Sequence, residues 1–334
     1  MHKTCFYILF FLATNKLVAQ TIGGTTVFNF ANQPNNASLA ALGGINISSI
    51  KNSVGLGFQN PALLRPNTEK KYEASFSNFF AGIKNYSFMA AQYLEKPSIT
   101  AAFGINYFNY GSITETDAAG NVYGNINLND FVLQVQASKQ YKENWFIGGT
   151  VKFISSNYGM YKSNGIAVDI GVCYYDSVKR FQAGFLVKNI GSQLKTYIPN
   201  TSKTELPFDI QLGITKRLEK APFQFSLTAQ HLQAFNILYN DTLFNTTEGN
   251  VQQAVFINKL FSHLIMASEI FIGDKVKATV SYNFLRGNDL YLYQTANGMS
   301  GFNLGLSLLL KKLHFHYATG FYRQNMYHQA SICF

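Results

Sequence analysis

Residues 207 to 231 carry an alternation of apolar and polar positions that recurs along most of the chain. The apolar members lie two apart, on either side of a short connection at 219 to 221: Phe208, Ile210, Leu212, Ile214, Phe223, Phe225, Leu227 and Ala229. A period of two is that of a β-strand, because successive side chains point to opposite faces of a sheet. The stretch therefore predicts a hairpin with one apolar and one polar face, which suits a soluble sandwich or a membrane barrel.

The same alternation predicts fourteen strands. They span residues 71–79, 86–94, 98–109, 130–141, 145–158, 164–175, 180–190, 207–218, 222–235, 261–272, 276–286, 301–311, 314–322 and 327–334. Most are as long as the roughly 9 to 11 residues that a tilted membrane strand needs, and longer than typical strands of soluble sheets. In the tenth strand, Leu264, Met266, Ile270 and Ile272 compete with Ile265, Ala267 and Phe271 for the outer face, which leaves its register open.

The connections between these strands alternate in length. Those after the even-numbered strands are short, whereas long polar loops are expected at 110–129, 191–206, 236–258 and 287–300. Short turns at one end and long loops at the other are typical of outer-membrane barrels, with the short turns in the periplasm. The final strand ends on Phe334, in the position of a C-terminal aromatic signal for barrel assembly. We predict an all-β protein, a transmembrane antiparallel β-barrel of about 14 strands.

Composition and the N-terminus support this placement. The chain of 334 residues is 47% hydrophobic and 15% aromatic but only 13% charged, which is little charge for a soluble protein. Residues 1–20 have the basic start, apolar run and small-residue end of a signal peptide cleaved after Ala19. No later apolar run is long enough for a helical span, so a closed barrel is the remaining way to cross a membrane.

Residues 21–68 lack the alternation and are rich in glycine and proline, with one short helix expected at 36–42 and capped by Asn36 or Ser38. Their apolar content indicates packing, and we expect them to form a plug inside the barrel of residues 69–334. Without the signal peptide the chain keeps 25 basic and 17 acidic residues. This charge suits lipopolysaccharide or an acidic partner, and no nucleic-acid partner is expected.

Candidate chemistry is sparse. His314 and His316 share one strand face and could approach His328, but no cysteine or carboxylate cluster accompanies them, so no metal site is predicted. A hydrolase could use His231 with Asp289 or Glu248, although nothing in the sequence brings these residues together. Cys173 and Cys333 fall in distant strands and indicate neither a disulfide framework nor a zinc motif. We predict a protein without catalytic residues or cofactors.

Two resemblances refine this picture. The motif Asn60, Pro61, Ala62 before the first strand resembles that of the FadL-type outer-membrane transporters, which also have fourteen strands and an N-terminal hatch. The N-terminal segments around Gly23, Phe28, Gly43-Gly44 and Asn60 to Leu64 look like those of the PorQ family of the Bacteroidetes type IX secretion system. This second resemblance implies an outer-membrane member of the attachment complex. It also implies that the protein acts with other complex members, retains a PorZ-like surface protein and supports cargo processing and attachment to lipopolysaccharide.

Three functions follow as hypotheses. The first is a non-enzymatic scaffold that binds a surface partner through its long loops, whose aromatic residues are Tyr123, Tyr197, Tyr239 and Phe244. The second is a channel for hydrophobic small molecules with residues 21–66 as a movable hatch. The third is an outer-membrane hydrolase that uses the histidines.

Overall fold

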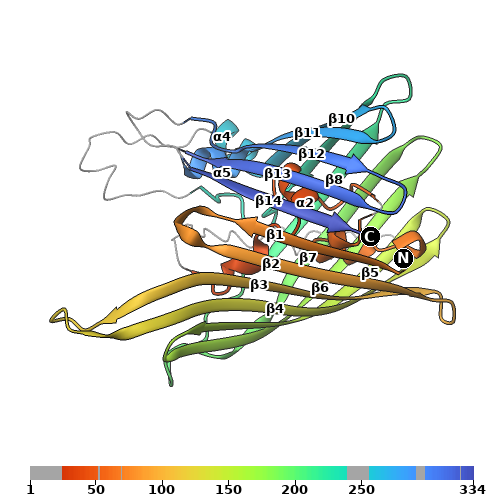
Figure 1. Cartoon of the computed structure of the whole chain (residues 1–334). Helices are drawn as coiled ribbons and strands as arrows, with labels where there is room; N and C mark the ends of the chain where they lie inside the picture. The colour runs from red at the N-terminus through yellow and green to blue at the C-terminus, as the bar shows by residue number, and fades with distance from the viewer. Residues whose placement is uncertain (1–24, 52, 69, 239–255, 291–297, 324) are drawn as a thin grey trace.

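The protein is a closed antiparallel barrel (Figure 1). The computed structural model describes residues 25–51, 53–68, 70–238, 256–290, 298–323 and 325–334. The strands of this part are β1 Lys71–Asn78, β2 Lys84–Leu94, β3 Ile99–Thr116, β4 Val122–Lys142, β5 Trp145–Tyr158, β6 Tyr161–Asp176, β7 Phe181–Lys195, β8 Asp209–Arg217, β9 Phe223–Ala229, β10 Leu264–Ile272, β11 Val276–Asn283, β12 Phe302–Leu309, β13 His314–Tyr322 and β14 Asn325–Cys333. These fourteen strands, paired in sequence order, confirm the predicted fold class.

The first and last strands close the barrel. β1 and β14 pair in antiparallel register, with Glu73 opposite Cys333. Phe334 extends this ladder, because its backbone N–H donates to the Tyr72 carbonyl at 2.9 Å and its carbonyl accepts from Tyr72 at 2.8 Å. The two aromatic rings are 5.7 Å apart. The chain thus ends on the residue that completes the seam.

The two faces of the wall have opposite character. Along β4 and β5 the polar Gln134, Gln136 and Lys152 point inward and are buried, whereas Val135 and Val151 point outward and are 61% and 53% exposed. Apolar side chains outside and polar side chains inside are what a barrel in lipid requires. The protein is therefore a multi-pass β-barrel of the outer membrane. In the described part of the chain, no helix combines the length and apolarity needed to cross a membrane.

The short turns lie at one end of the barrel, as predicted, but two of the stretches predicted as long loops are wholly or partly strand. β3 and β4 continue far beyond their neighbours as a projecting hairpin (Figure 1), so most of 110–129 is strand rather than loop. A bulge follows Asn109, where Gly111 has a φ of 80°, and pairing resumes at Ser112 and Asn127. Both faces of this hairpin are largely exposed, so its sequence lacks the apolar alternation by which strands are recognised. β7 likewise reaches Lys195, inside the loop expected at 191–206.

Three predicted strand ends are wrong. Residues 261–262 belong to helix α4 Phe256–Ser262, residues 284–286 begin helix α5 Phe284–Asp289, and β9 stops at Ala229 instead of 235. The tenth strand has one clear register: Leu264, Met266 and Ile270 face outward, whereas the buried face carries Glu269. The charge decides this register because lipid offers a carboxylate no partner.

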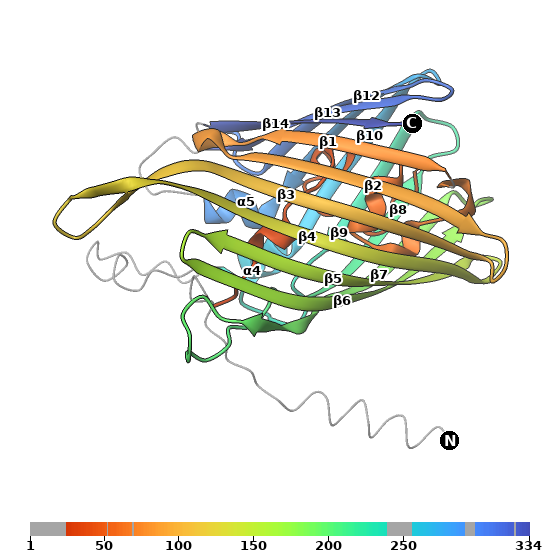
Figure 2. The same ribbon diagram turned by 60° about the horizontal axis from the view of Figure 1, so that its bottom comes forward.

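Residues 25–68 lie inside the barrel and form short helical turns joined by bends (Figure 2). We call this segment the plug. Its elements are η1 Asn29–Asn32, α2 Ala37–Ala41, η2 Val54–Phe58, η3 Pro61–Leu63 and η4 Pro66–Thr68; η5 Phe80–Gly82 lies between β1 and β2. Helix α2 matches the helix expected at 36–42, and the Asn36 side chain caps it by accepting from Leu39 N at 2.7 Å.

Candidate functional site

The plug motif Asn60-Pro61-Ala62 forms a compact turn against the wall. Asn60 Oδ1 accepts from the Ala62 N–H at 3.0 Å, and Asn60 Nδ2 donates to the Ile47 carbonyl at 2.9 Å. One amide thus caps η3 and ties together two parts of the plug. The turn lies directly against Gly148 of β5 and Gly171 of β6, and a Cβ at Gly148 would be only 2.6 Å from the Ala62 nitrogen.

Five more wall glycines receive plug residues in the same way. The pairs, each wall glycine named first, are Gly104 with Phe58, Gly165 with Phe28, Gly184 with Ile47, Gly213 with Ile47, and Gly305 with Ala41. A Cβ at any of these glycines would overlap the plug. We call the seven glycines, including Gly148 and Gly171, the glycine sockets. An isolated glycine inside a strand often marks a place where another part of the chain comes close. The sequence contains these glycines, but the alternation of apolar and polar residues does not point to them.

Gly43 and Gly44 end the plug helix. Their φ values of 93° and 92° lie in the left-handed region that favours glycine, and the Gly44 N–H donates to the Leu39 carbonyl at 3.1 Å. Asn283 of β11 donates its side-chain amide to the Gly43 carbonyl at 3.1 Å. The glycine pair therefore turns the chain and also fastens it to the wall.

Buried charged side chains bind the part of the plug from Lys51 to Gly55 to the wall. Lys51 Nζ lies 2.7 Å from Glu269 Oε1 on β10, and Lys277 Nζ on β11 lies 2.8 Å from the same oxygen. Further round the wall, Glu73 of β1 accepts from Ser53 Oγ at 2.6 Å and from the Gly55 N–H at 3.0 Å. Two buried carboxylates of the wall thus hold one short stretch of the plug.

Side-chain amides and one lysine bind the plug to β7 and β8. The Ile50 N–H donates to Gln182 Oε1 at 2.6 Å. Gln59 lies between two wall residues: its Nε2 donates to Gln211 Oε1 at 3.0 Å, and its Oε1 accepts from Lys188 Nζ at 3.0 Å. Together with the charged contacts, these bonds attach the plug to walls on several sides of the lumen.

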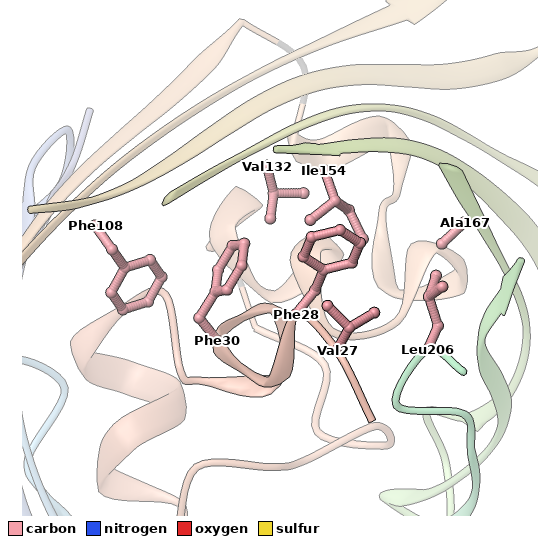
Figure 3. Packing of buried hydrophobic residues seen from close by; sticks show 8 residues of the cluster. All are labelled: Val27, Phe28, Phe30, Phe108, Val132, Ile154, Ala167 and Leu206. Atoms are coloured by element: carbon pink, nitrogen blue, oxygen red, sulfur yellow. The ribbon is translucent and has the colours of Figure 1, made fainter. Parts of the chain in front are cut away.

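An aromatic cluster surrounds the upper part of the plug. Phe28 and Phe30 lie among Phe108, Val132 and Ile154 of the wall, all buried (Figure 3). The Phe30 and Phe108 rings are 5.7 Å apart and nearly perpendicular, a favourable edge-to-face geometry. At this level, plug and wall side chains form one packed apolar cluster.

A buried carboxylate borders this cluster. Tyr110 and Tyr158 donate their hydroxyls to Asp130 Oδ2 at 2.6 and 2.8 Å. Tyr197 stacks on Tyr158 with ring centroids 5.5 Å apart, and it also approaches Phe28. Tyr197 is therefore half-buried and joins the loop after β7 to the plug.

The other loop aromatics are placed differently. Tyr123 is 68% exposed at the tip of the projecting hairpin and donates its hydroxyl to Asp117 Oδ2 at 2.9 Å. Hydrogen bonds from Asn121, the neighbouring backbone and Tyr123 lower the pKa of Asp117 to about 2. Tyr239 and Phe244 lie outside the described residues. The hairpin tip is thus an ordered turn that presents Tyr123 to solvent.

The histidines do not converge. His316 points inward, where its Nδ1 lies 2.8 Å from Ser307 Oγ, whereas His328 is on the outer face and bonds to Tyr317. His231 Nδ1 lies 3.5 Å from Asp209 Oδ1 rather than pairing with the predicted partner Asp289, and Glu248 is outside the described residues. Among the described residues, no three His, Cys, Asp or Glu side chains form a group that could hold a metal ion.

The fold resembles that of FadL-type channels. The crystal structure of the Pseudomonas putida toluene transporter TodX aligns with a TM-score of 0.53 over 90% of this chain and 96% of TodX, at 10% identity. A TodX deltaS2 mutant, described as a monoaromatic hydrocarbon channel, aligns with the same TM-score over 90% of this chain and 97% of that one, at 9% identity. No family model matches the sequence, and no curated protein matches it. At this identity the resemblance shows the fold alone.

Proposed function

We propose that this protein is a non-enzymatic outer-membrane scaffold that holds a surface partner, in the manner of the PorQ family of type IX secretion. In that role it belongs to the attachment complex, retains a PorZ-like surface protein and supports the processing of cargo and its attachment to lipopolysaccharide. The proposal rests on the N-terminal motifs that resemble PorQ and on one observation: the lumen holds a fixed plug while a long hairpin projects from the opposite end to the short turns.

The fixed plug favours a scaffold over a pore. The wall is built to the shape of the plug, because the glycine sockets have no side chains where plug residues lie. Buried hydrogen bonds and ion pairs to β1, β7, β8 and β10 would have to break before the segment could move. Breaking one buried ion pair without replacing it costs about 3–5 kcal/mol.

The hairpin of β3 and β4 supplies the docking surface. It exposes Ile113, Val122 and Tyr123, which are 49%, 67% and 68% exposed. Aromatic and branched apolar side chains on a rigid support are typical anchors of protein interfaces. The four hydrogen bonds that Asp117 accepts at the tip keep this support ordered without a partner.

The test is recovery of the partner from native membranes. Tagged protein is extracted in mild detergent, and bound proteins are identified by mass spectrometry. We expect a large secreted surface protein to co-purify, and we expect Ile113→Ser combined with Tyr123→Ser to reduce its recovery at least tenfold. The matched control is Tyr141→Ser, which removes an equally exposed tyrosine at the short-turn end. Recovery of the folded barrel alone from the unmodified strain would overturn the proposal.

A channel for hydrophobic small molecules is the second candidate. The fold similarity to the toluene transporter TodX favours it. This function requires the plug to move or to leave a path beside it, and the two proposals therefore differ in how they respond to a locked plug.

A further inference from the structure

A cavity of about 1110 Å³ opens at the end of the barrel that carries the short turns. Its inner surface is the underside of the plug, around Ile50 to Ser53 and Arg65. Its sides are the ends of strands β6 to β13, and its rim includes Arg180, Arg217 and Lys275. The short turns of outer-membrane barrels lie in the periplasm. The cavity thus faces the periplasm.

The cavity is strongly basic. Seven lysines and arginines line it but only two carboxylates, and one of these, Glu269, is already paired with Lys51 and Lys277. Within the described part of the chain, no carboxylate lies within 4.0 Å of Arg180 or Arg217. Positive charge therefore accumulates at the rim without a counter-charge from the protein.

The arginines are held in defined orientations. The Arg217 guanidinium lies 4.0 Å from the centre of the Phe271 ring, and that of Arg65 lies 3.6 Å from the centre of the Phe146 ring. Arg180 donates to the Leu218 carbonyl at 3.4 Å. A guanidinium stacked on a ring keeps its N–H groups free at the edge, in the forked geometry that matches phosphate or carboxylate oxygens.

Two buried nitrogen atoms of the cavity lining have no hydrogen-bond partner. They are Nε of Arg65 and Nε2 of His316, on side chains that are 6% and 5% exposed. Buried polar groups are nearly always satisfied by protein, water or a ligand. Arg65 Nε can only donate a hydrogen bond, and its position beside a large basic cavity suits an anion that reaches past the rim.

Apolar side chains complete the lining. Phe271, Leu309 and Leu310 lie on the same wall as Lys275 and Lys311. An acidic peptide would leave this apolar surface without a partner, whereas an amphiphile covers it with its chains. We infer that the cavity binds a phosphate-bearing amphiphile, with the phosphate at the arginines and the chains on the apolar wall. This inference does not depend on the proposed scaffold function.

The test measures binding to the purified full-length barrel in a non-ionic detergent by titration calorimetry. The probes are dihexanoyl phosphatidate, pyrophosphate, dihexanoyl phosphatidylcholine and hexaglutamate. The variant is Arg180→Gln combined with Arg217→Gln, and the matched control is Lys96→Gln combined with Lys220→Gln, which removes two exposed cations from turns at the same end that do not line the cavity. Both arginines are exposed, so the variant should fold, and circular dichroism checks this.

We expect saturable binding of phosphatidate that the arginine variant weakens at least tenfold and the lysine control leaves unchanged, since charge-assisted hydrogen bonds are the strong ones. Pyrophosphate that binds with the same arginine dependence supports the phosphate site, and if it alone binds, the natural source is a soluble phosphate. The inference is overturned if neither phosphate probe binds, or if the arginine variant binds them as tightly as the unmodified protein. It is also overturned if hexaglutamate alone binds, which would indicate an acidic protein as the ligand.

Discussion

Lys51 of the plug and Glu269 of the wall form an ion pair of 2.7 Å, and Lys277 shares the same carboxylate oxygen at 2.8 Å. Glu269 therefore pairs with two lysines at once, and substitutions at Glu269 and at Lys51 are not equivalent. Glu269→Gln leaves two buried ammonium groups side by side, whereas Lys51→Met leaves the pair of Glu269 with Lys277 intact.

We expect Glu269→Gln to destabilise the plug by about 3–5 kcal/mol and Lys51→Met by clearly less. Amide hydrogen exchange of residues 48–58, followed by mass spectrometry, measures this release. If residues 48–58 exchange in both variants at the rate of the unmodified protein, the ion pair does not hold the plug.

The glycine sockets predict a position-specific effect of adding one methyl group. At Gly184 a new Cβ would overlap the backbone carbonyl of Ile47, which cannot rotate away. Gly184→Ala should therefore cost about 1–3 kcal/mol and shift the plug. The control is Gly149→Ala on the same barrel, where the nearest atom to a Cβ is Asp169 O at 3.8 Å. Urea unfolding of both variants makes the comparison, and similar midpoints would argue against a fitted plug.

A covalent lock distinguishes the two proposed functions. The side-chain hydroxyls of Ser48 in the plug and Thr215 in β8 are hydrogen-bonded at 2.8 Å. A pair of cysteines at these positions is therefore close enough for a disulfide, a bond in which the two Cβ atoms lie about 3.8 Å apart. In the oxidised double variant, a scaffold should keep its surface partner at unchanged levels. A channel with a movable hatch should lose uptake of a probe such as radiolabelled toluene and regain it after reduction. Uptake lost in this way would favour the channel.

The hairpin tip should respond to acid. The pKa of Asp117 is lowered from 3.8 to about 2 by the hydrogen bonds it accepts. A lowered carboxylate pKa stabilises the folded turn at pH values above 3.8, and this contribution disappears as the pH falls through 2. We expect the Ala119 and Asn121 amides to be protected from hydrogen exchange at pH 5 and to lose protection near pH 2. Asp117→Asn should show low protection at both pH values, and a tip that stays protected in this variant would contradict the assignment.

The wall could be predicted from the sequence because lipid outside and a packed lumen inside impose one period on every strand. The same reasoning failed where a strand does not have lipid on one face and the packed lumen on the other, or where both of its faces carry apolar residues. Both faces of the hairpin around Ile113 and Tyr123 meet water, so the period that marks a strand vanishes although the hydrogen-bond ladder continues. In the tenth strand, apolar residues on both faces hid the register, and only the pairing of Glu269 with Lys277 resolves it.

The sequence predicts that the plug is a packed segment, but not which plug residues lie against which wall residues. Asn60 and Gly171 are 111 positions apart, and nothing local in the sequence indicates that one fills the space left by the other. The same holds for Lys51 and Glu269, whose partnership exists only once the barrel has closed. Tyr197, expected as a free docking residue, instead stacks on Tyr158, because the loop after β7 folds back over the lumen.

The fit between plug and wall also constrains how the molecule can be made. The plug precedes β1 in the chain and occupies the lumen, and β1 pairs with β14 from Glu73 to Asn78, with Phe334 extending the ladder to Tyr72. A ring that sealed first would have to admit some forty residues through a space that those residues fill. We therefore expect the seam to close around a segment already in place, so that the N-terminal segment shapes the wall in the final step of assembly.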